Sequence, residues 1–381
     1  MSLSNVEIVP VQDQQSRERF VRFAWHIYHD DPLWVPPLVR SQLHTLDPQR
    51  GSFFRYGDAA LFLARRDGQE VGRIAGWINH RANQFLDEKA AGFGFFETVD
   101  NYEVAKALLD AVCDWALGQG METIRGPFYF SMDDSPGVLI EGLDLPPVLM
   151  CGHSPLYYSD LLERYGLEKY RDAYAYWIDL SSFNGDVANL PPKILRVAES
   201  VRRRTGVQIR PARMEDWDAE VVRIMRLVNE AMGYMRNHVP MDEQEFIRYT
   251  DELRQVVDPD LIFLAEIDGQ PVGFSATIPD INQALREING HLFPVGWFRL
   301  WWRMRHTDVA SLKLLAVLQG HRLRGLDSLL YLETARALLR KGYTWLDMSL
   351  TAEHNITVNH LVQHLGGKRY KLYRTYHMSL T

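Results

Sequence analysis

The sequence has little cysteine, no excess of basic charge and no long apolar run. Its 381 residues include two cysteines, Cys113 and Cys151, which form neither a metal-ligand spacing nor a disulfide framework. Lysine and arginine number 42 against 49 aspartate and glutamate residues, so a broadly basic surface that binds nucleic acid is not expected. No stretch reaches the ~20 apolar residues of a membrane-spanning helix. We therefore expect a cytoplasmic protein with no nucleic-acid partner.

Two further signals are missing. The first residues, MSLSNVEIVPVQ, lack a basic segment followed by an apolar core, so we expect no secretory leader. The 13 histidines are scattered without the paired spacing of ligands, so no metal is expected. What the chain does have is 46% hydrophobic residues. At this length that content can fill the cores of about two domains of ~150 residues each.

An internal repeat indicates that the chain contains two copies of one fold. Residues 62–72 contain Phe-Leu-Ala, Asp-Gly-Gln and Val-Gly, and the same three groups recur in residues 263–273. In both copies Asp-Gly lies between alternating apolar runs, which predicts a two-residue hairpin turn. We predict one domain at residues 1–190 and a second at residues 207–381.

The hydrophobic periodicity predicts strands and helices in the same order in both copies. In the first copy we expect a helix at residues 14–28, a hairpin at 59–79, a strand at 92–99, a helix at 101–117 and a strand at 123–128. In the second copy we expect a strand at 207–211, a helix at 219–232, a hairpin, a strand at 312–318, a helix from 326, a strand at 344–350, a helix at 356–365 and a strand at 370–380. This order is that of an α/β fold with a mixed sheet flanked by helices.

A basic loop in the second copy connects the strand at residues 312–318 to the helix that follows. It carries His321, Arg322 and Arg324 beside the free N–H groups of the first helical turn. Such N–H groups and the helix dipole bind anions, most often phosphate. Gly325 would let the backbone come close to the anion. The alternative is an ordinary strand–loop–helix unit whose loop happens to be basic.

The six residues RLRGLD, from Arg322 to Asp327, resemble the R/Q-x-x-G-x-G/A pyrophosphate loop of the GNAT acyl-CoA N-acyltransferases. Asp327 differs from this pattern because the family has glycine or alanine there, and its carboxylate would lie close to a diphosphate. The resemblance implies that coenzyme A or acyl-CoA is bound by Leu315, Val317, Gln319, Arg322, Arg324, Gly325, Leu326 and Asp327. It also implies that the N–H around Val317 polarises the thioester carbonyl.

The segment after the next strand is similar to the family pattern N-x-x-A-x-x-L-Y-E-K-x-G-F. The matching residues are Asn355, Val358, Leu361 and Gly366. Val362 stands where the family tyrosine protonates the leaving thiolate, so another acid or water would be needed. Glu353 follows the end of a strand, where open α/β sheets place their ligands, and is a candidate base for the attacking amine. His354 is a second candidate base, Glu353 could instead satisfy the helix dipole, and we expect Asn355 to cap the helix.

The whole chain resembles the tandem-GNAT group of bacterial ceramide-synthase-like proteins. The motifs that carry this resemblance are Ile27-Tyr28, Asp31 to Pro37, Gly126-Pro127, Gly137 with Gly142, Tyr157-Tyr158, and Gly366-Gly367-Lys368 with Tyr370 to Arg374. It implies two tandem GNAT-like domains, of which the first lacks the phosphate loop and the second binds acyl-CoA. The implied reaction transfers an acyl group to a small amine or amino-lipid acceptor, with the first half completing the acceptor cleft. The alternative is a non-catalytic CoA- or acyl-lipid-binding protein that kept the fold, which Asp327 and Val362 favour.

Each copy carries one long insert. In the second copy the insert includes the stretch from Trp297 to Arg305, WFRLWWRMR, which suits a lipid headgroup boundary at the inner membrane face or an acyl-chain groove. The alternative is a helix whose tryptophans pack between the two halves while its arginines extend outward. In the first copy the insert includes Asp133-Asp134, which we interpret as a turn, with cation or amine binding as the alternative.

Overall fold

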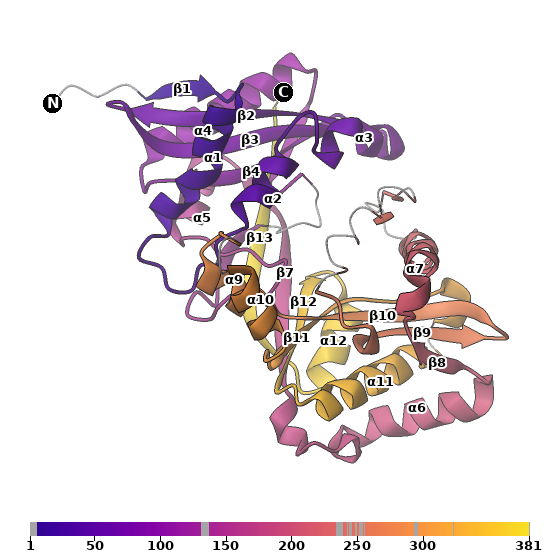
Figure 1. Cartoon of the computed structure of the whole chain (residues 1–381). Coiled ribbons are helices and arrows are strands. Elements are labelled where there is room, and N and C mark those ends of the chain that lie inside the picture. The colour runs from indigo at the N-terminus through magenta and orange to yellow at the C-terminus, as the bar shows by residue number, and fades with distance from the viewer. Residues whose placement is uncertain are drawn as a thin grey trace. The chain divides into compact units, whose positions relative to one another are not determined.

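A computed structural model describes residues 6–130, 137–233, 239–241, 256–292, 296–322 and 324–380, with single residues and one pair between 243 and 254. The chain divides into two compact units (Figure 1). Unit 1 contains Met1–Tyr174, Asn282–Leu300 and Tyr370–Thr381, and unit 2 contains Ala175–Ile281 and Trp301–Arg369. Asp133-Asp134 lies outside the described residues.

The sheet of unit 1 has the strand order β1-β2-β3-β4-β5-β13. These strands are β1 (Glu7–Pro10), β2 (Gly57–Arg66), β3 (Gln69–Asn79), β4 (Ala90–Thr98), β5 (Thr123–Gly126) and β13 (Lys368–Ser379). β4 and β5 run parallel, and the other neighbours are antiparallel. A short strand, β6 (Val138–Glu141), also pairs with β13.

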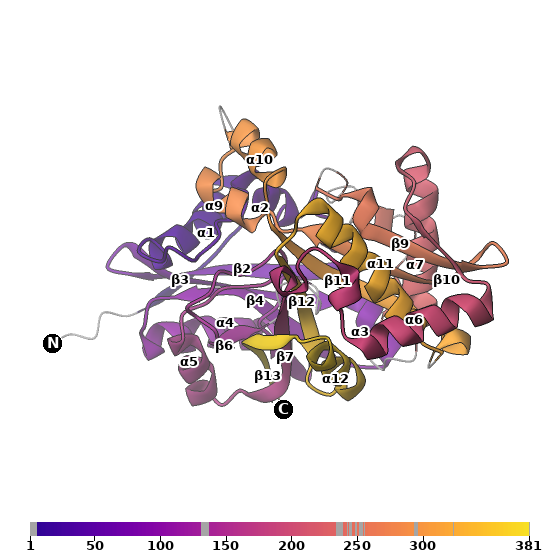
Figure 2. The same cartoon turned by 90° about the horizontal axis from the view of Figure 1, so that it is seen from below.

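Helices cover both faces of this sheet, as Figure 2 shows. The helices of unit 1 are α1 (Gln14–Ile27), α2 (Val39–Thr45), α3 (His80–Leu86), α4 (Tyr102–Gly118), α5 (Tyr157–Tyr165) and α9 (Asn282–Ile288). One core contains Phe20 and Val21 of α1, and the other contains Leu108 of α4 and Leu162 of α5. The second-copy helix α9 packs beside α1 and α2, where Asn289 Oδ1 accepts a 2.8 Å hydrogen bond from Trp25 Nε1.

The sheet of unit 2 has the order β8-β9-β10-β11-β12, with β7 beside β12. These strands are β7 (Glu168–Asp179), β8 (Gln208–Pro211), β9 (Ile262–Ile267), β10 (Gln270–Pro279), β11 (Val309–Val317) and β12 (Trp345–Ala352). β11 and β12 run parallel, whereas the pairs β8–β9, β9–β10 and β10–β11 are antiparallel. None of the helices in the described part of the chain is long and apolar enough to cross a membrane.

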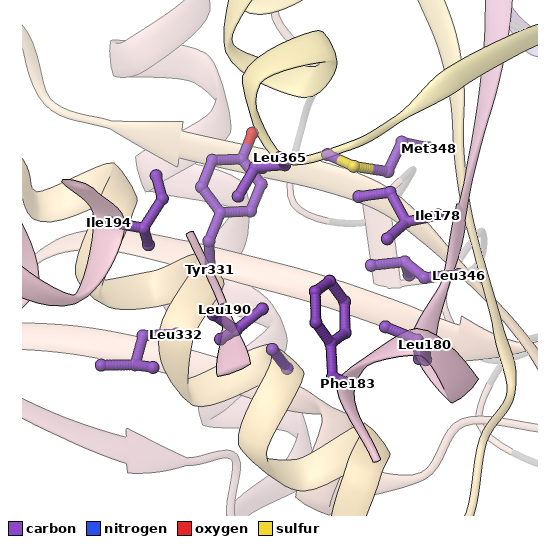
Figure 3. Close-up of a pocket in the computed structure, with 11 residues that line it drawn as sticks. Ile178, Leu180, Phe183, Leu190, Ile194, Tyr331, Leu332, Leu346, Met348 and Leu365 are labelled. Carbon is purple, nitrogen blue, oxygen red and sulfur yellow. The ribbon is translucent and has the colours of Figure 1, made fainter. Parts of the chain in front are cut away.

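Unit 2 also has helices on both faces of its sheet. They are α6 (Pro192–Thr205), α7 (Trp217–Met232), α11 (Leu326–Lys341) and α12 (Ile356–His364), and α10 (Gly296–Met304) begins in unit 1. α7 buries Phe274 and Ala316 on one face, whereas α11 contacts the other face through Thr334, whose Oγ1 lies 3.2 Å from Ser275 Oγ. Apolar side chains line a cavity under α6 and α11 (Figure 3). Its volume of about 20 Å³ is too small for an alkyl chain, so this region is packed core.

The two predicted hairpins are present, at β2–β3 and β9–β10. In the first turn Asp67 and Gly68 have φ of 52° and 78°, and in the second Asp268 and Gly269 have φ of 50° and 75°. Two successive positive φ values match the right-handed twist of the flanking strands, and Asp-Gly tolerates them better than most dipeptides. The repeat read from the sequence is therefore a repeat of one hairpin structure.

The last strand of each copy lies in the sheet of the other unit. β13 closes the second sequence copy, yet Tyr376 to Ser379 of β13 pair with β5 of unit 1. β7 closes the first copy, yet its second half, from Ala175, belongs to unit 2, where β7 neighbours β12. The compact units therefore differ from the contiguous ranges 1–190 and 207–381 by this exchange of strands and by Asn282–Leu300, which belongs to unit 1.

Candidate functional site

An opening between two parallel strands of unit 2 is the first feature of the candidate site. β11 and β12 pair at three positions, which end with Ser311 opposite Asp347. Opposite β10 the register of β11 passes from Leu312 to Leu314, so Lys313 forms a bulge. A bulge bends the strand and increases its twist, and because the paired positions of β11 and β12 end just before it, we infer that the two strands diverge beyond this point.

The edge of β11 that faces this opening presents backbone groups. Leu318 N–H donates to Val272 O of β10 over 2.9 Å, so it points away from β12. Because successive residues of a strand point their N–H groups in opposite directions, those of Leu315 and Val317 face the opening. The cofactor-binding role that the GNAT resemblance implies for these two residues stays a prediction.

The N-terminus of α11 follows the opening. Gly325 is its N-cap, with φ of 82° and no side-chain hydrogen bond to the first turn. The N–H groups of Leu326 and Asp327 are therefore available, as in anion-binding helix starts. Arg324 is exposed beside them, and the buried Nδ1 of His321 has no hydrogen-bond partner among the described residues. Uncapped helix N–H groups beside an exposed guanidinium favour an anionic ligand at this helix start.

Two residues of the predicted loop also have structural contacts. Arg322 donates from Nε to Val317 O over 3.0 Å and from Nη2 to Ala231 O, so its guanidinium holds the end of β11 to the end of α7. A Cβ on Gly325 would lie 2.5 Å from Val197 Cγ1 of α6. The glycine is therefore required by α6 and by its left-handed φ, apart from any phosphate.

The candidate base and the predicted helix cap lie in the turn between β12 and α12. Asn355 is the N-cap of α12 and accepts from Val358 N–H over 3.3 Å, which confirms the predicted cap. Glu353 is half-buried, and its carbonyl accepts from Asn359 Nδ2 over 3.3 Å. Asn359 in turn accepts from Tyr176 OH over 3.1 Å, so the turn is held from both sides. Val362, at the place of the family tyrosine, is completely buried.

A buried polar cluster that the sequence analysis missed lies where β11 and β12 separate. Asp347 Oδ1 accepts hydrogen bonds from Ser311 Oγ and from Ser349 Oγ, the second over 2.6 Å. Lys313 Nζ lies 3.3 Å from Ser349 Oγ and 3.8 Å from Asp347 Oδ1. No motif predicts this cluster, because its members come from two strands that are distant in sequence.

The corresponding opening in unit 1 is closed by the chain itself. β4 and β5 pair up to Gly92 and Arg125, and Phe128 N–H then donates to Phe93 O over 2.9 Å. Asn101 caps α4 by accepting from Val104 N–H over 3.3 Å. In this copy the strand edge and the helix start are therefore occupied by hydrogen bonds within the chain.

Residues from several of the motifs that carry the family resemblance lie around the buried carboxylate of Glu97 in unit 1. Tyr28 OH and Tyr158 OH donate to Glu97 Oε2 over 2.8 and 2.7 Å. Burial raises the pKa of Glu97, whereas Arg73, at 3.5 Å, and the two hydroxyls lower it. Nearby, His153 Nε2 lies 2.7 Å from Asp31 Oδ2 in the Asp31 to Pro37 motif, and burial lowers the pKa of this imidazole.

Helix α10 exposes aromatic side chains. Trp297, Phe298 and Trp302 are 55%, 52% and 53% exposed.

Among the described residues of unit 2 and unit 1 no group of three or more histidine, cysteine, aspartate or glutamate side chains is arranged to hold a metal ion.

Comparison with known proteins gives two long matches. Bacterial ceramide synthase of Caulobacter vibrioides (strain NA1000 / CB15N) is 30% identical over 384 residues, covering 99% of this chain and 98% of that protein. Protein YghO of Escherichia coli (strain K12) is 31% identical over 364 residues, covering 94% and 91%. No family model matches the chain.

Two solved structures are similar over almost the full length. A tandem GNAT protein from the clavulanic acid biosynthesis pathway has a TM-score of 0.59 at 13% identity, covering 99% of both chains. A GCN5-related N-acetyltransferase from Sphaerobacter thermophilus has a TM-score of 0.55 at 15% identity, covering 98% and 96%. The expected fold, two tandem GNAT-like domains with mixed sheets flanked by helices, is thereby confirmed.

Proposed function

The chain belongs to the family of bacterial ceramide synthase and Protein YghO, with a tandem GNAT fold, and we propose that it transfers an acyl group from acyl-CoA to an amine. The observation that carries the proposal is the opening between β11 and β12 beside an uncapped helix start. Acyltransferase activity in general follows from the family. The donor, the acceptor and the residues involved are the proposed part.

The diphosphate of acyl-CoA would bind the first turn of α11, at Gly325, Leu326 and Asp327, with Arg324 as its cation. The pantetheine arm would follow the free edge of β11 at Leu315 and Val317, and an N–H of this edge would stabilise the developing oxyanion. Gln319, exposed in the loop, and Arg322, which fixes the end of β11, would complete the binding site.

Glu353 would take a proton from the attacking amine. Its turn is fixed by the Asn355 cap and by Asn359, which supports a defined position for the carboxylate. His354, exposed in the same turn, is the second candidate base.

The name of the Caulobacter relative supports a long-chain amino alcohol as acceptor, because a ceramide is the amide of a fatty acid and such an amine. Between Trp297 and Arg305, the exposed aromatics of α10 and the neighbouring arginines would contact the lipid surface at the cytoplasmic face of the membrane. Sedimentation with anionic lipid vesicles tests this contact. Binding equal to that of a Trp297→Ser/Trp302→Ser variant would refute it.

Thiol release and calorimetry test the donor and the reaction. Acyl-CoA donors of increasing chain length, combined with a panel of amines, should release coenzyme A, and Glu353→Gln should slow release without changing donor affinity. Coenzyme A should bind once per chain. Arg324→Ala should weaken it by about 1.5–3 kcal/mol, the loss of a hydrogen bond to a charged group. Asp327→Gly should strengthen binding if this carboxylate faces the diphosphate.

Arg340→Ala is the matched control, because Arg340 is exposed in the last turn of the same helix. It should bind coenzyme A like the wild type, and a loss equal to that of Arg324→Ala would remove the proposed anion site. The competing function is a non-catalytic protein that binds coenzyme A or an acyl lipid. The buried Val362, which leaves no tyrosine at the family position, favours it. Coenzyme A binding without release from any donor would establish that alternative.

A further inference from the structure

The cluster of Ser311, Lys313, Asp347 and Ser349 lies at the inner end of the opening in unit 2. Ser311 and Asp347 form the last paired position of β11 and β12, and Lys313 is the bulged residue that follows on β11. Across the opening, Lys313 Nζ is 3.3 Å from Ser349 Oγ. The ammonium therefore lies between the two strands at the point where they separate.

Burial makes this cluster costly for a purely structural role. Asp347 and Ser311 are completely buried, and the Lys313 side chain is 10% exposed. Removing an ion pair from water costs several kcal/mol per ion, and apolar residues of similar size often hold a strand edge as well or better. Lys313 Nζ donates to Ser349 Oγ over 3.3 Å and lies 3.8 Å from Asp347 Oδ1, so among the described residues one of its three N–H donors is used in a hydrogen bond.

We propose that Lys313 is the acid that protonates the thiolate leaving acyl-CoA, with Asp347 and Ser349 as positioning residues that hold its ammonium group. This inference rests on the proposed function, and it supplies the acid that the proposed reaction needs for the leaving thiolate. The family tyrosine position is held by Val362, whose side chain is completely buried and has no proton to give.

In the proposed acyl-transfer step every proton that is released or taken up has a stated donor and acceptor. The acceptor nitrogen attacks the thioester carbon and loses one proton, which Glu353 or water takes up. The carbon–sulfur bond then breaks with its electron pair going to sulfur, and one proton passes from Lys313 Nζ to that sulfur. The products are the amide and free coenzyme A, and Lys313 regains its proton through solvent, so no further reactant is needed.

The test measures acyl transfer by the wild type and by Lys313→Met from two thioesters that differ in their leaving group. Acyl-CoA and the S-(4-nitrophenyl) thioester of the same fatty acid are each supplied with a long-chain 2-amino alcohol. Positioned acids contribute about 10²–10⁴-fold, so transfer from acyl-CoA should fall at least about 100-fold. Transfer from the nitrophenyl thioester should fall less than about 10-fold, because that thiolate leaves without a proton. Coenzyme A affinity by calorimetry should stay within about 3-fold of the wild type.

Two controls separate chemistry from folding. Ser311→Ala removes one hydrogen bond to the same carboxylate on the paired side of the cluster and should slow both thioesters equally and slightly. Lys313→Met/Asp347→Asn removes both charges, so no carboxylate is left buried alone, and it should show the same selective loss as Lys313→Met.

Each outcome decides one question. An equal fall for both thioesters, or unchanged turnover of acyl-CoA, would overturn the role of Lys313 while leaving the proposed acyl transfer intact. Absence of transfer from every acyl-CoA in the wild type would instead overturn the proposed function.

Discussion

Alanine substitutions of the two glycines at the ends of α11 measure how tightly α6 packs against the loop before α11. Gly325 and Gly342 both have φ of 82°, so alanine at either position should cost about 1–2 kcal/mol in this left-handed region. A Cβ at Gly342 would meet nothing within 4 Å. At Gly325 it would lie 2.5 Å from Val197 Cγ1 and 2.9 Å from Val201 Cγ2.

Overpacking of this kind adds about 1–3 kcal/mol. We therefore expect the free energy of unfolding to fall by about 2–5 kcal/mol in Gly325→Ala and by about 1–2 kcal/mol in Gly342→Ala. Urea unfolding followed by tryptophan fluorescence measures both, and the midpoints are comparable if the slope against urea does not change.

The double variant Gly325→Ala/Val197→Ala tests the cause. Removing the Val197 methyl groups clears the closest contact, so the double variant should recover most of the excess loss at Gly325. Equal losses of unfolding free energy in Gly325→Ala and Gly342→Ala would show that α6 moves aside without a free-energy cost, and would refute the packing argument. Coenzyme A binding by Gly325→Ala, measured where the variant is folded, then reports on the anion site alone.

Two pH predictions concern unit 1. The folded pKa of Glu97 is raised, chiefly by burial, so between the unfolded value of about 4.3 and the folded value the native chain binds more protons. The free energy of unfolding should fall as pH rises through that window, and Glu97→Gln should remove this part of the slope in urea titrations at several pH values. The folded pKa of His153 is lowered by burial against the opposing Asp31 hydrogen bond, so below about pH 6.5 the unfolded chain binds more protons. The free energy of unfolding should therefore fall as pH falls below this value, and His153→Gln should flatten that decline. An unchanged slope in His153→Gln would show that the pKa of His153 is not lowered in the folded protein.

Local signals in the sequence were sufficient for many elements. The Asp-Gly hairpins, the Asn355 cap and the strand–loop–helix at β11 and α11 depend on residues close together in the chain, and all are present. The whole-chain resemblance was confirmed as well, because its motifs are spread over almost the full length.

Long-range contacts could not be predicted in the same way. A repeat identifies two copies but does not say which sheet receives the last strand of each, since Lys169-Tyr170-Arg171 of β7 resembles Arg369-Tyr370-Lys371 of β13. Likewise, nothing near Gly325 in the sequence indicates that Val197 of α6 packs on it, and nothing near Arg322 indicates its hydrogen bond to Ala231. The cluster at Lys313 depends on the register of β11 against β12, which is set by the folded sheet.

The two copies explain why one donor site per chain is the expected number. Both contain a strand, a turn and a helix start in the same order, but α4 begins at Asn101, whose side chain accepts from Val104 N–H, and α11 begins at Gly325, which has no side chain to do so. A self-capped start has already used the N–H groups that an anion would bind. Asp100 and Glu103 add negative charge around the first helix start, where the Arg66 guanidinium is bonded to the Asn101 cap over 3.2 Å, whereas Arg324 is exposed beside the second. Backbone capping and charge therefore favour the same helix, α11.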